Sequence, residues 1–167
     1  MKNILIAGAN GLIGSFLCEK FDQSYSIISI SANKNSFKKQ IIPLDLTDQK
    51  ALSLFVKNSI VCDILVFLVG LAHKKGKGKE LEEFRAINKQ TLINLISNLE
   101  RRNKMPEKII FASTISVYGE KISKVIYSED SDKRPFSPYA VSKLEAEEYL
   151  QKYFPNKSWI VRFAPVY

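Results

Sequence analysis

The chain has 167 residues and a formal net charge of +8, with 46% hydrophobic and 25% charged residues. This length supports one domain with a hydrophobic core, and the composition is that of a globular protein, which argues against a disordered or fibrous one. The longest apolar stretch, residues 64–72, is too short to cross a bilayer.

The N-terminus and the two cysteines indicate the compartment of the protein. Residues 1–3 lead directly into an apolar segment, without the cleavage pattern of a secretory signal peptide. Cys18 and Cys62 lie in apolar sequence and are expected to be buried thiols. Because free thiols are typical of reducing compartments, we expect a cytoplasmic protein that is not bound to a membrane.

Much of the positive charge lies in three lysine-containing segments, residues 34–39, 74–79 and 121–124. They lack the interleaved aromatic residues of a nucleic-acid groove, so no nucleic-acid partner is expected. Two interpretations stay open: a solvated lysine-rich surface, or a field that attracts an anionic cofactor or substrate.

Apolar runs alternate along the chain with segments of helical periodicity. Strands are predicted at residues 3–7, 25–30, 40–44, 64–69, 108–113 and 158–163. Helices are predicted at residues 12–21, 48–58, 79–102 and 138–154. This alternation predicts an α/β fold: a doubly wound parallel sheet of the Rossmann type, with helices on both faces and residues 1–167 as a single domain. Such a fold places a ligand crevice at the carboxyl ends of the strands.

A glycine turn, residues 8–14, joins the first predicted strand to the first predicted helix. Gly8 suits a tight turn, Gly11 lets the backbone approach a pyrophosphate, and Gly14 permits close packing of the helix on the sheet. The helix N-terminus adds amide donors and a positive dipole end for phosphate. The turn predicts a dinucleotide site, although Asn10 stands where the G-x-G-x-x-G pattern has its second glycine.

Tyr139 and Lys143 lie four residues apart in the last predicted helix, so they share one face of it. A lysine ammonium beside a phenol favours the phenolate and is expected to lower the pKa of the tyrosine. A tyrosine of this kind can move protons to and from a sugar hydroxyl or carbonyl near neutral pH.

With these motifs in order, the chain resembles the extended short-chain dehydrogenase/reductases, the NAD(P)-dependent epimerase/dehydratase family. The glycine turn is similar to the family's G-x-x-G-x-x-G turn, and residues 113–119 are close to its Ser-Ser/Thr-x-x-Val-Tyr-Gly segment. Residues 137–143 match its Ser-Pro-Tyr-x-x-Ser-Lys motif, and residues 162–167 resemble its Arg-x-x-x-Val-Tyr run.

The resemblance implies a role for each candidate site residue. Tyr139 would act as acid and base on the substrate oxygen, Thr114 would hydrogen-bond that oxygen, and Lys143 would hold the nicotinamide ribose and lower the pKa of the tyrosine. Hydride would pass between a sugar carbon and the nicotinamide. Residues expected at the cofactor are Gly8, Asn10, Gly11, Leu12, Ile13, Gly14, Ser31, Asn33, Lys34, Asp45, Leu46, Val69, Gly70, Leu71, Asn88, Tyr139 and Lys143.

Some of these residues also have simpler interpretations. Asp45, which the resemblance places at the adenine, could instead be the N-cap of the following helix. Thr114 could cap a turn after its strand, and Asn88 could satisfy buried backbone groups. His73, the only histidine, is expected at the entry of a loop, and no metal site is expected.

The choice between NAD and NADP stays open. The second predicted strand ends without the Asp or Glu that binds the ribose 2′-hydroxyl of NAD. Ser31, Asn33, Lys34 and Lys38 could accommodate a 2′-phosphate instead, which would favour NADP.

The function implied by the resemblance is that of an NAD(P)-dependent epimerase, dehydratase or reductase acting on a nucleotide-sugar. Pro165 stands where many sugar-nucleotide epimerases carry Asn, which favours a reductase-like or deviant relative over a plain 4-epimerase. Family members continue into a substrate lobe, so the chain is expected to be the cofactor-binding part of an enzyme, inactive alone. Members also form homodimers through helices that correspond to residues 79–102 and 138–154. The alternative is a non-catalytic dinucleotide-binding sensor or interaction module.

Overall fold

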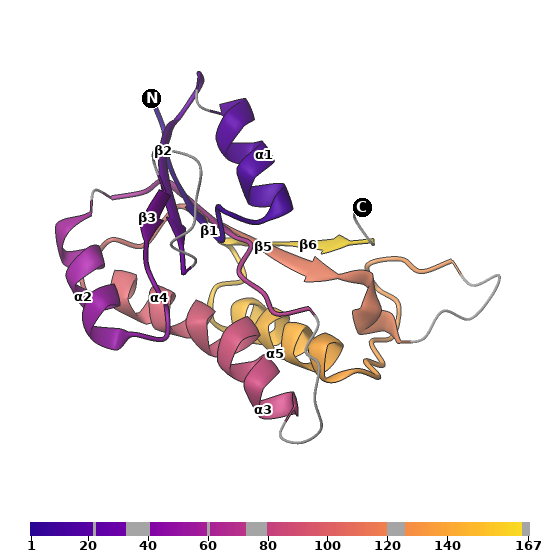
Figure 1. The fold of residues 1–167 in the computed structure, drawn as a ribbon. Coiled ribbons are helices and arrows are strands. Elements are labelled where there is room, and N and C mark those ends of the chain that lie inside the picture. Colours follow the sequence, from indigo (N-terminus) through magenta and orange to yellow (C-terminus); the bar gives the residue numbers. More distant parts are fainter. Residues whose placement is uncertain (22, 33–40, 60, 73–79, 120–125, 165–167) are drawn as a thin grey trace.

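A six-stranded parallel sheet forms the centre of the molecule (Figure 1). The computed structural model describes residues 1–21, 23–32, 41–59, 61–72, 80–119 and 126–164. The sheet has the order β3-β2-β1-β4-β5-β6, and all its neighbouring strands are parallel, which confirms the predicted doubly wound fold. The strands are β1 (Asn3–Ala7), β2 (Ser26–Ser31), β3 (Ile41–Pro43), β4 (Ile64–Phe67), β5 (Lys108–Thr114) and β6 (Ser158–Phe163).

The helices lie close to the predicted ranges. They are α1 (Leu12–Phe21), α2 (Gln49–Asn58), α3 (Glu80–Arg85), α4 (Thr91–Glu100) and α5 (Pro138–Tyr153). The segment predicted as one helix at 79–102 divides into α3 and α4, because the five residues between them, Ala86–Gln90, form a π-helical turn, η1. A short 3-10 helix, η2 (Ile115–Tyr118), follows β5.

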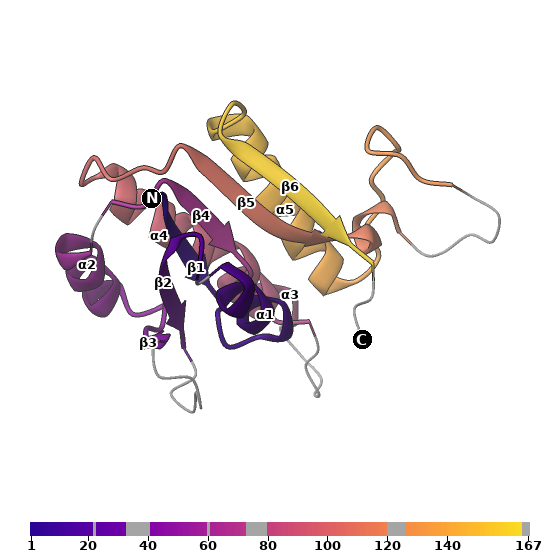
Figure 2. The same cartoon turned by 90° about the horizontal axis from the view of Figure 1, so that it is seen from above.

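Alternating side chains of the buried strands supply the apolar surface for two layers of helices. Ile4 and Ile6 of β1 face α1, where they pack with Leu17 and Phe21. Leu5, Phe67 and Phe111 face the other side, where α2, α4 and α5 contribute the remaining core. Figure 2 shows α1 on one side of the sheet, with α4 and α5 across the sheet from it.

The face that carries α1 is only partly covered. None of the described helices lies over β5 and β6 on this face (Figure 2). Trp159 and Val161 of β6 are 58% and 39% exposed there, and the Lys108 ammonium lies 4.9 Å from the centre of the Trp159 indole. An apolar strip therefore remains open to solvent on this side of the described structure.

The strand order also decides where a ligand can bind. β1 and β4 are neighbours at the centre of the sheet, yet the chain leaves them in opposite directions, towards β2 and towards β5. In open α/β sheets, the crevice beyond the carboxyl ends of such a strand pair is the usual ligand site. The glycine turn after β1 and Thr114 at the end of β5 both lie at this edge.

Candidate functional site

The glycine turn has the geometry that its sequence predicts. Gly8 has φ of +87°, which a residue with a side chain adopts only with strain, and the backbone N–H groups of Gly8 and Ala9 both donate to the Ile30 carbonyl at 3.0 and 3.1 Å. A Cβ at Gly14 would lie 2.8 Å from the Ala9 Cα, so only glycine lets α1 approach the turn this closely. At the start of α1, Leu12 is exposed, while Asn10 and Ile13 are half-buried.

A pocket of about 90 Å³ lies beside this turn, at the ends of β1 and β2. Five of the predicted cofactor residues line it: Gly8, Ser31, Asp45, Leu46 and Val69. Its other lining residues are Ile30, Ala32, Leu44, Ile87 and Thr91. The pocket is small and mostly apolar, with one carboxylate among its lining residues.

The structure excludes one of the two interpretations of Asp45, and its expected contact with the adenine stays a prediction. The N-cap of α2 is Asp48, whose carboxylate accepts from the N–H groups of Lys50 and Ala51 at 2.9 and 3.0 Å. Asp45 instead accepts from the backbone N–H and the hydroxyl of Thr47, at 2.8 and 2.7 Å. The N-cap alternative for Asp45 is therefore wrong, and its carboxylate is held at the pocket by Thr47.

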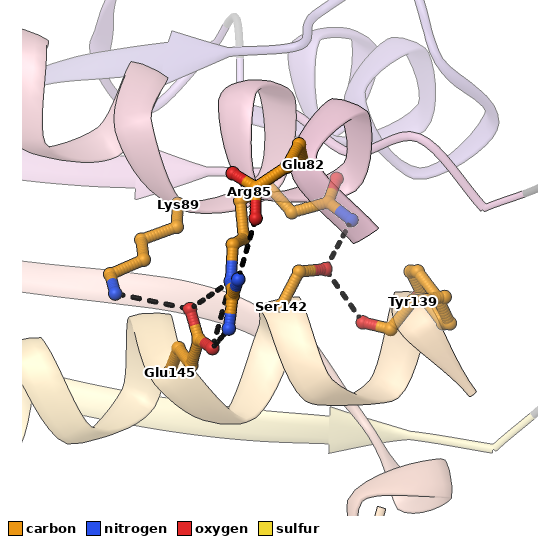
Figure 3. A network of polar contacts seen from close by, with 7 residues as sticks. Glu82, Arg85, Lys89, Tyr139, Ser142 and Glu145 are labelled. Carbon is orange, nitrogen blue, oxygen red and sulfur yellow. Dashed lines mark hydrogen bonds and ion pairs between the residues drawn. The ribbon is translucent and has the colours of Figure 1, made fainter. Parts of the chain in front are cut away.

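Asn88 lies in the π-helical turn and is fully buried. Its side-chain oxygen accepts from the Leu71 N–H at 2.6 Å, while its amide nitrogen donates to the Leu71 carbonyl at 3.1 Å and to the Ser142 hydroxyl at 2.9 Å. Ser142 in turn donates to the Tyr139 carbonyl at 2.8 Å (Figure 3). The backbone role considered for Asn88 is thus present, and it ties the segment after β4 to the start of α5.

Gly70 lies at the meeting point of these elements. A Cβ there would come within 3.1 Å of the Lys143 ammonium nitrogen and 3.5 Å of the Asn88 side-chain oxygen. The absence of a side chain lets the lysine reach the end of β4. The predicted residues Val69, Gly70, Leu71 and Asn88 therefore gather around Lys143.

Thr114 ends β5 and is 7% exposed. Its hydroxyl accepts from the Ser116 N–H at 3.2 Å, which caps η2, and donates to the Ser116 hydroxyl at 3.1 Å. The Thr114 side chain also acts to lower the pKa of the Tyr139 phenol, against the larger effect of burial. The capping interpretation holds, and the expected hydrogen bond from Thr114 to the substrate oxygen stays a prediction.

Lys143 is 3% exposed and does not act on Tyr139 as the sequence predicted. Its ammonium donates to the carbonyls of Val69 and Ala112 at 3.2 and 2.9 Å and lies 4.8 Å from the centre of the Phe111 ring. Burial, the dominant effect on both groups, raises the pKa of Tyr139 and lowers the pKa of Lys143 to about 8. The expected lowering of the tyrosine pKa by the lysine is therefore wrong for this arrangement, because the lysine is bound to backbone carbonyls.

Several sequence expectations fall outside the described residues. They concern Asn33, Lys34 and Lys38, His73, the lysine-glycine segment 74–79, and Pro165. Within the described ranges, no group of three or more His, Cys, Asp or Glu residues could hold a metal ion. The helices in those same ranges are too short or too polar to cross a membrane.

Comparison with known proteins extends these observations. Residues 4–166 match the model of the NAD dependent epimerase/dehydratase family. The chain belongs to this family. It is 32% identical to an uncharacterized UDP-glucose epimerase of Bacillus subtilis (strain 168), over 98% of this chain and 56% of the relative. It is 28% identical to the N-acetyl-alpha-D-glucosaminyl-diphospho-ditrans,octacis-undecaprenol 4-epimerase of Escherichia coli O157:H7, over 93% of this chain and 44% of the relative.

Solved structures of epimerases share the fold. The UDP-Glc/GlcNAc 4-epimerase of Campylobacter jejuni superimposes with a TM-score of 0.81 and 26% identity, over 97% of this chain and 53% of that one. The UDP-glucuronic acid 4-epimerase of Bacillus cereus, solved in complex with NAD, gives a TM-score of 0.71 at 26% identity, over 96% of this chain and 56% of that one. The chain spans about half the length of these family members.

Five residues of the pocket were not predicted as site residues from the sequence of this family member: Ile30, Ala32, Leu44, Ile87 and Thr91. Ile87 precedes Asn88 in the chain, and Thr91 lies three residues after it, so helical spacing from Asn88 is a signal that could have found Thr91. The sequence has no pattern that predicts the π-helical turn η1 itself. Its formation depends on how these residues pack between the end of β4 and α5. The buried pair Glu147 and Arg162 was also missed, since its members lie on different elements.

Proposed function

We propose that this chain is the cofactor-binding part of an NAD-dependent epimerase or dehydratase that acts on a nucleotide-sugar. The observation that carries the proposal is the meeting of the glycine turn and its pocket with Thr114, Tyr139 and Lys143 at one edge of the sheet. Membership of the family supports the class of reaction. A relative solved with NAD supports NAD as the cofactor.

The residues present fit a dinucleotide. The turn at Gly8 exposes the N-terminus of α1, which suits a pyrophosphate, and the pocket beside Asp45 suits an adenosine. A bound nicotinamide would supply the hydride transfer. It would extend from the turn towards the ends of β4 and β5, because Gly70 and Thr114 lie there.

The side chains at these strand ends would transfer a proton to and from the substrate oxygen. Thr114 acts on the Tyr139 phenol, whose hydroxyl would exchange a proton with a substrate oxygen. Lys143 has a pKa of about 8 and remains largely cationic at neutral pH, so its ammonium can hold the ribose hydroxyls.

The substrate class follows from the relatives. The names of the relatives specify UDP-linked sugars, a dTDP-linked glucose, and a sugar linked through a diphosphate to undecaprenol. The common feature is a sugar attached to a diphosphate. We propose a diphosphate-linked sugar as the substrate of the whole protein.

A titration of this chain with NADH, followed by nicotinamide fluorescence, tests the cofactor assignment. We expect saturable binding, and a parallel titration with NADPH tests the alternative raised by Lys34 and Lys38. Absence of saturable binding by either cofactor would contradict the proposal.

Substitution of Tyr139 by Phe in the whole protein tests the chemistry. We expect turnover to fall by about a hundredfold or more while NADH affinity stays close to that of the wild type, because only the transferable proton is removed. Tyr153→Phe, an exposed tyrosine of the same helix, is the matched control. Wild-type turnover in Tyr139→Phe would contradict the acid/base role. Binding of NADH without any turnover of diphosphate-linked sugars would favour a non-catalytic module.

A further inference from the structure

Glu147 is a carboxylate buried completely in the layer between α5 and the sheet. Its two oxygens accept from the Arg162 Nε at 3.1 and 3.2 Å, and one of them accepts from the terminal nitrogen of the same guanidinium at 2.7 Å. The hydroxyl of Ser113, on β5, donates to the other oxygen. Every donor that this buried carboxylate receives is charged or directed by a neighbouring element, so the side chain is fixed in place.

Arg162 of β6 connects this carboxylate to the chain that follows β5. Its second terminal nitrogen donates to the Tyr118 hydroxyl at 2.7 Å and to the Glu129 carbonyl at 3.4 Å, and its guanidinium lies 5.1 Å from the centre of the Tyr118 ring. Both hydrogen-bonding edges of Arg162 are therefore used. The ion pair of Glu147 and Arg162 links α5 and β6 to the end of β5 and to η2.

Glu147 follows Lys143 by one helical turn, so the two side chains share the buried face of α5. The Lys143 ammonium donates to carbonyl oxygens, and among the described residues no carboxylate accepts a hydrogen bond from it. In a site shielded from water, a charge one turn away acts strongly. Glu147 is the carboxylate placed to compensate the lysine charge, and its attraction opposes the effect of burial on the lysine pKa.

The other ionisable groups near this part of α5 are either bound in ion pairs or neutral. Glu145, on another face of the helix, binds Arg85 at 2.5 Å and Lys89 at 3.1 Å (Figure 3). Tyr139 has a raised pKa and stays neutral at neutral pH. Within the described ranges, Glu147 is the charged group that acts on Lys143, and Arg162 is its ion-pair partner.

We propose that Glu147, fixed by Arg162 and Ser113, is a positioning residue that keeps the Lys143 ammonium charged. This inference rests on the proposed function only where it concerns turnover, because the charge state of Lys143 can be measured without cofactor or substrate. If the cationic lysine supports catalysis, loss of Glu147 moves the alkaline limb of the pH profile of kcat to lower pH.

The direct test is an NMR titration of the Lys143 ammonium in this chain with Glu147→Gln. We expect its pKa to fall by about one unit from the wild-type value, because the compensating negative charge is lost. Glu145→Gln is the matched control, since it removes a carboxylate from the same helix that faces Arg85 and Lys89. It is expected to leave the Lys143 titration unchanged.

A second variant keeps the test decisive if Glu147→Gln leaves Arg162 too poorly paired to fold. In Glu147→Gln/Arg162→Gln both members of the buried ion pair become neutral, so no uncompensated charge remains. We expect a smaller fall in the Lys143 pKa than in Glu147→Gln, because loss of the Arg162 positive charge partly offsets loss of the Glu147 negative charge. A wild-type titration of Lys143 in either folded variant, or an equal shift in Glu145→Gln, would overturn the proposal. Failure of NADH binding would affect only the proposed function.

Discussion

At the scale of single residues, the chemistry of the site depends on how a lysine is buried. The spacing of Tyr139 and Lys143 predicted a shared helix face, and the structure places both at the carboxyl ends of β4 and β5. The spacing could not show that the ammonium binds the carbonyls of Val69 and Ala112, because those atoms belong to strands distant in sequence. Burial has the largest effect on the pKa values of both residues.

Lys143 gives the stability of the fold a defined pH dependence. Its pKa in the folded chain is about 8, below the ordinary value of 10.5, so the unfolded chain binds more protons between these values. The free energy of unfolding therefore increases as the pH rises from about 8 to 10.5. The same contribution is lost as the pH falls back through this window, and it is absent below about pH 8. Between about pH 7.5 and about pH 9.5, we expect the wild type to gain about 2 kcal/mol relative to Lys143→Met in urea unfolding. Equal pH dependence of both proteins would contradict this, and Lys152→Met, on the same helix, is the control.

At the scale of elements, two aspartates three residues apart have separate tasks. Asp48 caps α2, whereas Asp45 is turned to the pocket by Thr47. The sequence could not separate them, because both residues precede the same helix and both suit an N-cap. The sequence also could not predict that η1 divides the helix expected at residues 79–102, since a π-helical turn has no distinct periodic pattern.

The two aspartates allow a paired prediction. Asp48→Ala is expected to lower the free energy of unfolding by about 1 kcal/mol, because two N–H groups of α2 lose their acceptor, and to leave NADH affinity close to the wild type. Asp45→Ala is expected to weaken NADH binding with a smaller effect on stability. Chemical unfolding and NADH titration of both variants measure this. The reverse pattern would show that Asp45 has no role in the cofactor pocket.

At the scale of the whole molecule, the sheet is covered unevenly. Helices α2, α4 and α5 cover one face, whereas α1 covers only part of the other and leaves Trp159 and Val161 exposed over β5 and β6. The apolar run at residues 158–163 predicted the strand β6, but exposure of its outward face depends on which helices pack beside it.

Trp159 is the only tryptophan and reports on this open strip. At low protein concentration, we expect a red-shifted emission spectrum that acrylamide quenches readily, because the indole is 58% exposed. Trp159→Lys is expected to retain the fold and reduce any self-association seen by sedimentation at high concentration, since it removes the largest apolar group of the strip. A blue-shifted spectrum that resists acrylamide at low concentration would show that the strip is covered in solution.

The sequence by itself determined the order of strands and helices, the glycine turn and the residue types of the site. These features are local: periodicity sets each element, and the positive φ at Gly8 and the close approach at Gly14 each require glycine. The tertiary structure alone decided which groups meet, as in the bonds of Asn88 to Leu71 and Ser142, and of Glu147 to Arg162. Those partners lie on different elements, so their pairing and the resulting charge of Lys143 depend on strand order and helix packing. The spacing of residues in the sequence does not show the strand order or the helix packing.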